Sequence, residues 1–261
     1  MKIAICLYGY VGTSQKYGQL TTCPTLSYDF LEKSILNINK NHSIDIFIHS
    51  WSHEYQELLI DLYHPVDSIF EPQIDFSKLF EDLNYTNTVK TRYFALFSKW
   101  YSVRKVLDLM TIHHQQKSYD LILLNRFDLC WKIPVDLNIF ESSNIYCGYM
   151  PPNRRGICKL DDAYVIGNFN NILVVRKIYK FILGILNDKI KRVKKPHIFY
   201  LQSPHHALYR IFELKDLIKH IKYYFKPYED YTPVRYLNNN ITVDIKSPPT
   251  ETCLKIILEP L

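Results

Sequence analysis

YDLILLNRFD, residues 119–128, is a short run of aliphatic residues that ends in an amide, a cation and a carboxylate. A nearly continuous apolar run of this length is typical of a strand that is buried on both faces of a parallel sheet. Two earlier runs, Ile3–Leu7 and Ile44–Ile48, have the same character and also lead into polar and aromatic residues. The three runs therefore predict strands whose carboxyl ends share one edge of an open α/β sheet, where ligands bind.

Helical patterns separate these strands. Tyr28–Asn39 and Thr88–His113 have apolar residues at the spacing of a helix that packs on one face. The alternation of strand and helix predicts an α/β fold, with a mixed, mostly parallel sheet flanked by helices. Further elements are expected later in the chain: strands at Ile145–Tyr149 and Ala163–Ile166, and helices at Asn171–Leu186 and from Ser203-Pro204 to Phe212.

Composition excludes several classes of protein. The chain has 261 residues, 47% hydrophobic and 22% charged, which excludes an intrinsically disordered protein. A net charge of +6 suits a polyanionic small molecule and falls short of a nucleic-acid binder. Six cysteines without a C-x-x-C pair favour a reducing, cytoplasmic compartment. No apolar run is long enough to span a membrane, and the basic segment Lys189–Lys195 is either a solvated loop or a peripheral contact with an anionic membrane.

Arg126 and Asp128 are the strongest local signal, because charges at the mouth of a buried strand need compensation. Two interpretations have about equal weight: an ion pair that closes the sheet edge, or a carboxylate that meets a divalent cation. The adjacent acids Asp161 and Asp162 precede a short strand. One of them could act as a general base, although a capping turn is the simpler explanation. Since neighbours in an extended chain point to opposite faces, we expect only one of them to face a given site.

The long helix and the Ser-Pro-led helix add further candidates. Lys99 lies on the long helix beside a polar stripe at positions 98, 101, 102 and 105 that could face a nucleotide. His205 lies in the first turn of its helix, where the helix dipole favours a neutral imidazole that is able to bind metal. A packed or capping histidine is the alternative. The motifs of the common NTPases, dehydrogenases, serine hydrolases and zinc proteases are absent from the sequence.

Several segments, in order along residues 2–212, carry a resemblance to a known family. They are KIAICLYGYVG, DIFIHSW, FSKWYSVRKV, YDLILLNRFDL, DDAYVIGN and the Ser-Pro-led helix near residue 203. Together they resemble small GT-A-type glycosyltransferases of bacterial polysaccharide clusters and large DNA viruses. The resemblance implies a GT-A-like (Rossmann-like) fold in one domain over 1–261, with a nucleotide-binding half in 1–130 and an acceptor-side half with a C-terminal extension in 131–261.

The same resemblance implies roles for individual residues. The R-x-D at 126–128 is similar to a variant of the D-x-D motif, which holds Mn²⁺ or Mg²⁺ on the diphosphate of a nucleotide sugar. The chain departs from the family pattern at Arg126, at Lys16 in place of an arginine in the opening loop, and at His205 in place of a glutamate. The expected site residues are, for the nucleotide, Tyr8, Gly9, Ser50, Trp51, Lys99 and Arg126; for the metal, Asp128 and His205; and as the base, Asp161 or Asp162.

We therefore expect a cationic pocket that binds a UDP- or GDP-linked sugar and transfers the sugar to a hydroxyl of a glycan, glycolipid or protein. Two alternatives stay open. One is a nucleotidyl- or phosphosugar transferase on the same fold, and the other is a catalytically silent protein that binds a nucleotide sugar. A nucleic-acid module is a distant third, because no basic stripe interleaved with aromatic residues is present beyond Lys189–Lys195.

Overall fold

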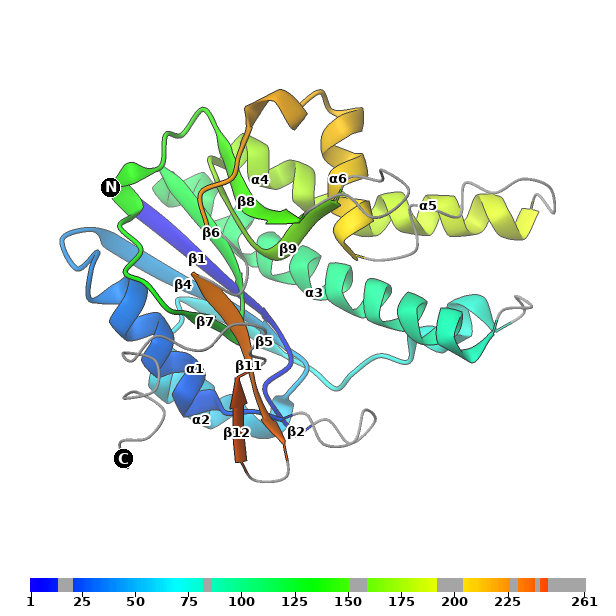
Figure 1. Cartoon of the computed structure of the whole chain (residues 1–261), viewed down its shortest axis with the longest axis horizontal. Coiled ribbons are helices and arrows are strands. Elements are labelled where there is room, and N and C mark those ends of the chain that lie inside the picture. The colour runs from blue at the N-terminus through cyan, green and yellow to red at the C-terminus, as the bar shows by residue number, and fades with distance from the viewer. Residues whose placement is uncertain are drawn as a thin grey trace.

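The computed structural model describes residues 1–13, 21–81, 86–150, 159–191, 204–225, 230–237 and 240–243. A seven-stranded sheet in the order β10-β8-β9-β6-β1-β4-β5 forms the centre (Figure 1). Its strands are β1 (Lys2–Gly9), β4 (Ser43–Ser50), β5 (Asp67–Phe70), β6 (Leu121–Arg126), β8 (Ile145–Met150), β9 (Lys159–Gly167) and β10 (Ile221–Lys222). Only β9 runs against its neighbours. The predicted α/β class with a mixed, mostly parallel sheet is confirmed.

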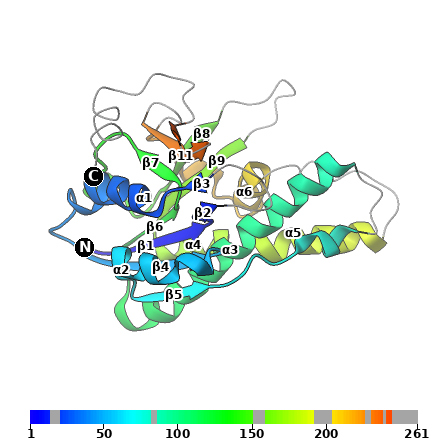
Figure 2. The same ribbon diagram turned by 90° about the horizontal axis from the view of Figure 1, so that it is seen from below.

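Helices cover both faces of the sheet (Figures 1 and 2). They are α1 (Pro24–Leu31), α2 (Gln56–Tyr63), α3 (Asn87–Lys117), α4 (Phe169–Arg176), α5 (Ile178–Lys191) and α6 (Pro204–Leu214). Along β1, Ile3, Ile5 and Leu7 join the core on the side of α1 and α2, whereas Ala4 and Cys6 join the core on the side of α3. Because successive strand residues alternate between faces, a strand covered on both sides must be apolar throughout, as the sequence of β1 is.

A second, smaller sheet lies beside the first. Its order is β12-β11-β3-β2, and β7 pairs with β11. The strands are β2 (Gly12–Thr13), β3 (Thr21–Thr22), β7 (Leu129–Trp131), β11 (Tyr231–Leu237) and β12 (Asn240–Val243). Most of these strands are too short to show a hydrophobic period, so the sequence did not predict them. Through this sheet, Tyr231 comes to lie against β9, far from it in sequence.

Several boundaries differ from those predicted. The first helix begins at Pro24 and continues as a π-helical turn over Glu32–Leu36. The helix expected at Asn171–Leu186 is two helices, α4 and α5, because the chain turns at Lys177, whose N–H bonds to the Val174 carbonyl three residues back. A break of this kind leaves the apolar spacing of both helices intact and is therefore invisible to periodicity.

The acid-bearing strand β9 bulges at its two acids. On β8, Cys147 pairs with Val165 and the next residue, Gly148, pairs with Asp161, so the three β9 residues between these partners have no counterpart on β8. A bulge interrupts the alternation of side chains and re-aims them. Asp161 and Asp162 also lie within β9 rather than before it, and both offer a carboxylate oxygen to the same place. The expectation that only one acid would face the site is therefore wrong.

Some expectations fall outside the described residues. Lys16 and Ser203 lie there, as do residues 192–195 of the basic segment Lys189–Lys195; of its first three residues only the backbone at the end of α5 is described. Within the described ranges, no helix combines the length and apolarity needed to cross a bilayer.

Gly148 leaves no room for a side chain, and its replacement tests the bulge. A Cβ at this position would lie 1.9 Å from Tyr231 Oη and 2.7 Å from Asp161 Cβ. We expect Gly148→Ala to lower the free energy of unfolding by about 2 kcal/mol, in the range of overpacked cores. Gly184→Ala is the matched control: that glycine lies in α5 with nothing within 4 Å of a Cβ, so a helix-favouring alanine there should not destabilise the protein.

Chemical denaturation of the variants measures both effects. In a Tyr231→Phe background, which lacks the nearest clashing atom, Gly148→Ala should cost less. An equal cost of Gly148→Ala in both backgrounds would show that the hydroxyl does not fill this space.

Candidate functional site

The ends of the predicted strands meet at one edge of the sheet. In the register of the parallel strands, Tyr8 lies between His49 on β4 and Arg126 on β6, and Gly9 pairs with Ser50. The prediction that the first, second and RFD-bearing strands finish side by side is confirmed. The acid-bearing end of β9 and the start of α6 adjoin the same edge, since His205 on α6 bonds to the main chain of Leu160.

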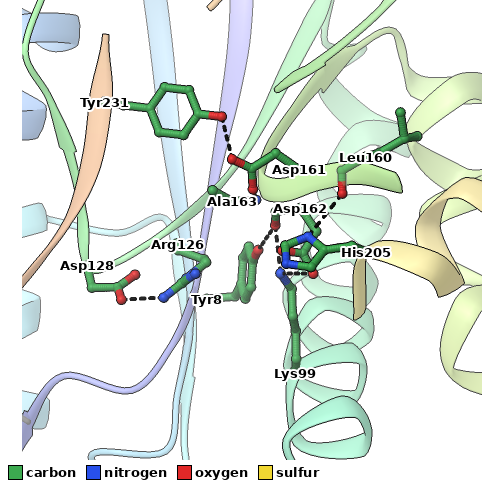
Figure 3. A network of polar contacts seen from close by, with 10 residues as sticks. All are labelled: Tyr8, Lys99, Arg126, Asp128, Leu160, Asp161, Asp162, Ala163, His205 and Tyr231. Carbon is green, nitrogen blue, oxygen red and sulfur yellow. Dashed lines mark hydrogen bonds and ion pairs between the residues drawn. The ribbon is translucent and has the colours of Figure 1, made fainter. Parts of the chain in front are cut away.

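Asp162 is the centre of a polar network (Figure 3). One carboxylate oxygen, Oδ2, lies 2.6 Å from Lys99 Nζ, and the other, Oδ1, lies 3.1 Å from His205 Nδ1. The Asp162 carbonyl accepts hydrogen bonds from Tyr8 Oη at 2.8 Å and from Lys99 Nζ at 2.7 Å. The Asp162 side chain is only 4% exposed, so these contacts replace the water that the carboxylate loses on folding.

The electrostatics of the network follow from this pairing. Burial by itself would raise the pKa of Asp162, but Lys99 and His205 hold it well below its ordinary range. Burial lowers the pKa of Lys99, and Asp162 offsets only part of that fall. Burial acts to lower the pKa of His205, but the charge of Asp162 and its hydrogen bond together outweigh burial and raise the pKa. This direction is opposite to the effect expected of the helix dipole, because a contacting carboxylate outweighs the dipole.

Asp161 has a different environment from its neighbour. Its Oδ2 accepts a hydrogen bond from Tyr231 Oη at 2.6 Å, and its Oδ1 accepts one from the Ala163 N–H at 3.1 Å. Both partners are neutral donors. A carboxylate has about four lone-pair sites, so Asp161 retains acceptor capacity that an ion pair would have taken.

Arg126 and Asp128 form the ion pair that was one of the two interpretations of this motif. Among the described residues, the partner of the Arg126 side chain is Asp128, which is bound through Nη2. The Arg126 side chain is 26% exposed, and its guanidinium carries five N–H donors in all, so it has donors left for a ligand. Gly9 lies next along β1, with φ +115° and nothing within 4 Å of where a Cβ would be. The chain thus leaves open space at the residue that follows Tyr8, the sheet partner of Arg126.

Two residues expected to border the nucleotide lie inside the protein. Ser50 is fully buried, and its hydroxyl accepts a hydrogen bond from the Ser52 N–H. Trp51 is 3% exposed and stacks on Tyr101, with ring centroids 5.2 Å apart. The structure therefore brings together Tyr8, Lys99, Arg126, Asp128, Asp161, Asp162 and His205 (Figure 3), with Gly9 beside them, and places Ser50 and Trp51 in the neighbouring core.

A buried hydrogen-bond chain that the sequence did not reveal supports Gly9. The Gly9 N–H donates to Ser102 Oγ at 3.1 Å, and Ser102 Oγ lies 2.7 Å from His49 Nδ1. His49 Nε2 lies 2.9 Å from Glu71 Oε1. Burial lowers the pKa of His49, and the hydrogen bond and charge of Glu71 offset part of that effect. Ser102 belongs to the polar stripe that was expected to face a nucleotide. Its hydroxyl contacts Gly9 and His49 of the protein.

Two carboxylates and an imidazole, from Asp161, Asp162 and His205, lie within 4.8 Å of one another and form what we call the Asp-Asp-His cluster. In kind these groups suit a divalent cation. Asp128, expected as the partner of His205 at a metal, is not part of the cluster and pairs with Arg126 instead. In this arrangement the cluster does not fit a metal, since Lys99 lies at one carboxylate and His205 Nδ1 faces the Leu160 carbonyl.

The charges at this edge nearly cancel. Lys99 and Arg126 are paired with Asp162 and Asp128, and Asp161 adds a third carboxylate. With two fixed cations and three carboxylates, the net charge of this group depends on His205. Among these described residues, each of the two fixed cations has a carboxylate partner.

Comparisons with known proteins carry no argument about the function of this chain. No protein-family model matches the chain, and no curated protein matches it. Among solved structures, the crystal structure of mouse xyloside xylosyltransferase 1 in its apo form is similar, with a TM-score of 0.41 and 11% identity. The match covers 86% of this chain and 85% of that one. A function for this chain must therefore be argued from its own residues.

The raised pKa of His205 predicts a pH-dependent contribution to stability. A group whose pKa is higher in the folded than in the unfolded state stabilises fully below its unfolded pKa, here the ordinary 6.5, and loses this effect as pH rises through the folded value. Compared with His205→Gln, the native protein should therefore have a larger melting-temperature advantage at acidic than at alkaline pH. Thermal unfolding across this range measures it; a constant difference would contradict the ion pair with Asp162.

Proposed function

We propose that this chain is a glycosyltransferase that moves a sugar from a nucleoside-diphosphate sugar, UDP- or GDP-linked, to a hydroxyl of a glycan, glycolipid or protein. The observation that carries the proposal lies at the carboxyl edge of parallel strands: Arg126 uses one nitrogen on Asp128, and its sheet partner Tyr8 is followed by Gly9, where a Cβ would meet nothing within 4 Å. That edge is where open α/β sheets bind ligands. A planar fork of N–H donors matches the paired oxygens of a diphosphate.

In this proposal Arg126 binds the diphosphate, and Asp128 holds the guanidinium in place through its ion pair. As the glycosidic bond breaks, the diphosphate leaves with the bonding electron pair and gains charge. A cation that is fixed in advance stabilises this charge without reorganisation. Tyr8 and Gly9 border the nucleotide in the half 1–130, and Ser50 and Trp51 support that wall from the core. The half 131–261 would receive the acceptor.

Asp161, rather than Asp162, is the base in this proposal. A general base works best when its pKa lies near the working pH, and Lys99 with His205 holds the pKa of Asp162 far too low for that role. Asp161 has neutral partners and spare acceptor capacity. Its carboxylate takes the proton of the acceptor hydroxyl while the hydroxyl oxygen forms the new bond to the sugar carbon. Asp162 and Lys99 hold β9, α3 and α6 together around it.

Donor binding tests the role of Arg126. Calorimetric titration with UDP, GDP and their sugars should give saturable binding for one base, and Arg126→Ala should weaken it at least tenfold. One charge-assisted hydrogen bond is worth about 1.5–3 kcal/mol, and about 1.4 kcal/mol is a factor of ten. Arg92→Ala, at an exposed position of the long helix α3, is the control and should bind as the native protein does. Equal affinity in the Arg126→Ala variant would remove the guanidinium from the site.

Turnover tests the role of Asp161. With a bound donor and a panel of acceptor hydroxyls, product mass should show transfer of the sugar alone. Asp161→Asn should lower kcat by about 10²–10⁴ while donor affinity stays unchanged, since a base acts on the acceptor. Transfer of a phosphosugar or nucleotidyl group would instead indicate a phosphosugar or nucleotidyl transferase. Donor binding without any turnover would indicate a catalytically silent binding protein.

A further inference from the structure

The Asp-Asp-His cluster has the residue types of a divalent-cation site, yet a cation from the chain itself already lies against it. Lys99 Nζ is 2.6 Å from Asp162 Oδ2 and 2.7 Å from the Asp162 carbonyl oxygen. The same ammonium lies over the rings of Tyr8 and Trp100, 5.5 and 5.4 Å from their centroids. A carboxylate, a carbonyl and two ring faces supply what a desolvated cation needs. They form a cation site that a side chain of the protein occupies; Figure 3 shows Lys99 with Tyr8 and Asp162.

Other atoms of the cluster that could bind a metal, His205 Nδ1 and the two oxygens of Asp161, already have hydrogen-bond partners. His205 Nδ1 lies 3.0 Å from the Leu160 carbonyl oxygen and 3.1 Å from Asp162 Oδ1. A carbonyl oxygen only accepts hydrogen bonds, so this nitrogen carries the proton and has no lone pair to give to a metal. Both oxygens of Asp161 accept hydrogen bonds from Tyr231 and Ala163. A metal bound to Asp162 Oδ2 would have to displace the ammonium, and one bound to His205 Nδ1 would have to remove its proton.

We propose that Lys99 is the resident cation of the Asp-Asp-His cluster and that it excludes divalent metal from Asp162. Lys99 is 13% exposed and Asp162 is 4% exposed. A metal bound to the same oxygen would therefore lie within a few ångströms of the ammonium, where little water screens their repulsion. The inference concerns cation binding and stands whether or not the chain transfers sugar. Under the proposed function, on which this consequence rests, donor binding would depend on Arg126 and not on a metal at this cluster.

Removing the ammonium should create the metal site. Lys99→Met keeps most of the apolar stem and frees Asp162 Oδ2. Titration with Mn²⁺ alone, followed by the electron paramagnetic resonance of the free ion, should show one Mn²⁺ per Lys99→Met chain with an affinity at least about tenfold above that of the native protein, the scale at which a neighbouring group tunes a metal site. Added Mn²⁺ should also raise the melting temperature of this variant. A second change, Asp162→Asn, should abolish the gain.

Lys105→Met is the matched control, since it makes the same change on the same helix at a lysine that packs over Tyr101 instead. It should bind Mn²⁺ as weakly as the native protein. A folded Lys99→Met protein without the new site would overturn the proposal. If that variant does not fold, the native protein still decides the matter: one tight Mn²⁺ per chain that is lost in His205→Gln would overturn the proposal, and its absence in the native protein would support it. No nucleotide is present in these titrations, so a failure of sugar transfer leaves their outcome unaffected.

Discussion

A buried carboxylate must be compensated or it cannot stay ionised, and the arrangement around Asp162 follows from that requirement. Its two oxygens face Lys99 and His205, and its carbonyl receives Tyr8 and Lys99. These partners come from α3, α6 and β1, and Asp162 itself is on β9. One residue therefore ties together four elements that the hydrophobic core alone would bring near one another without fixing their mutual positions.

The bulge in β9 allows the neighbouring acid to take a different role. Three residues without partners on β8 bring Asp161 and Asp162 to the same place, yet they meet opposite surroundings. One is held by cations and the other by neutral donors. Two carboxylates with separate environments can have separate chemistry, which is how a single site can hold a structural anion beside a candidate base. This arrangement requires a glycine at position 148, since any side chain there would clash with Asp161.

At the same edge of the sheet, Arg126 and Gly9 have fewer contacts within the protein than Asp162 has. Arg126 uses one nitrogen on Asp128, and Gly9 leaves space where a side chain would project. Behind Gly9, a buried chain of hydrogen bonds through Ser102 and His49 holds its N–H. A rigid backbone beside unused donors is an arrangement suited to an anionic ligand, because the donors do not need to reorganise when it binds. The proposed diphosphate site rests on this contrast with the closed cluster around Asp162.

The amino-acid sequence determined the fold class, because a strand buried on both faces must be apolar throughout, and Ile3–Leu7, Ile44–Ile48 and Leu121–Leu124 are the chain's near-continuous apolar runs that end in polar residues. It also indicated the edge at which these residues meet. The tertiary structure alone decided the pairings: Lys99 with Asp162, Tyr231 with Asp161 and Glu71 with His49 join residues far apart in the chain. It likewise decided the direction in which the pKa of His205 shifts, since a pKa depends on which charge lies three ångströms away, and spacing along a sequence does not carry that distance.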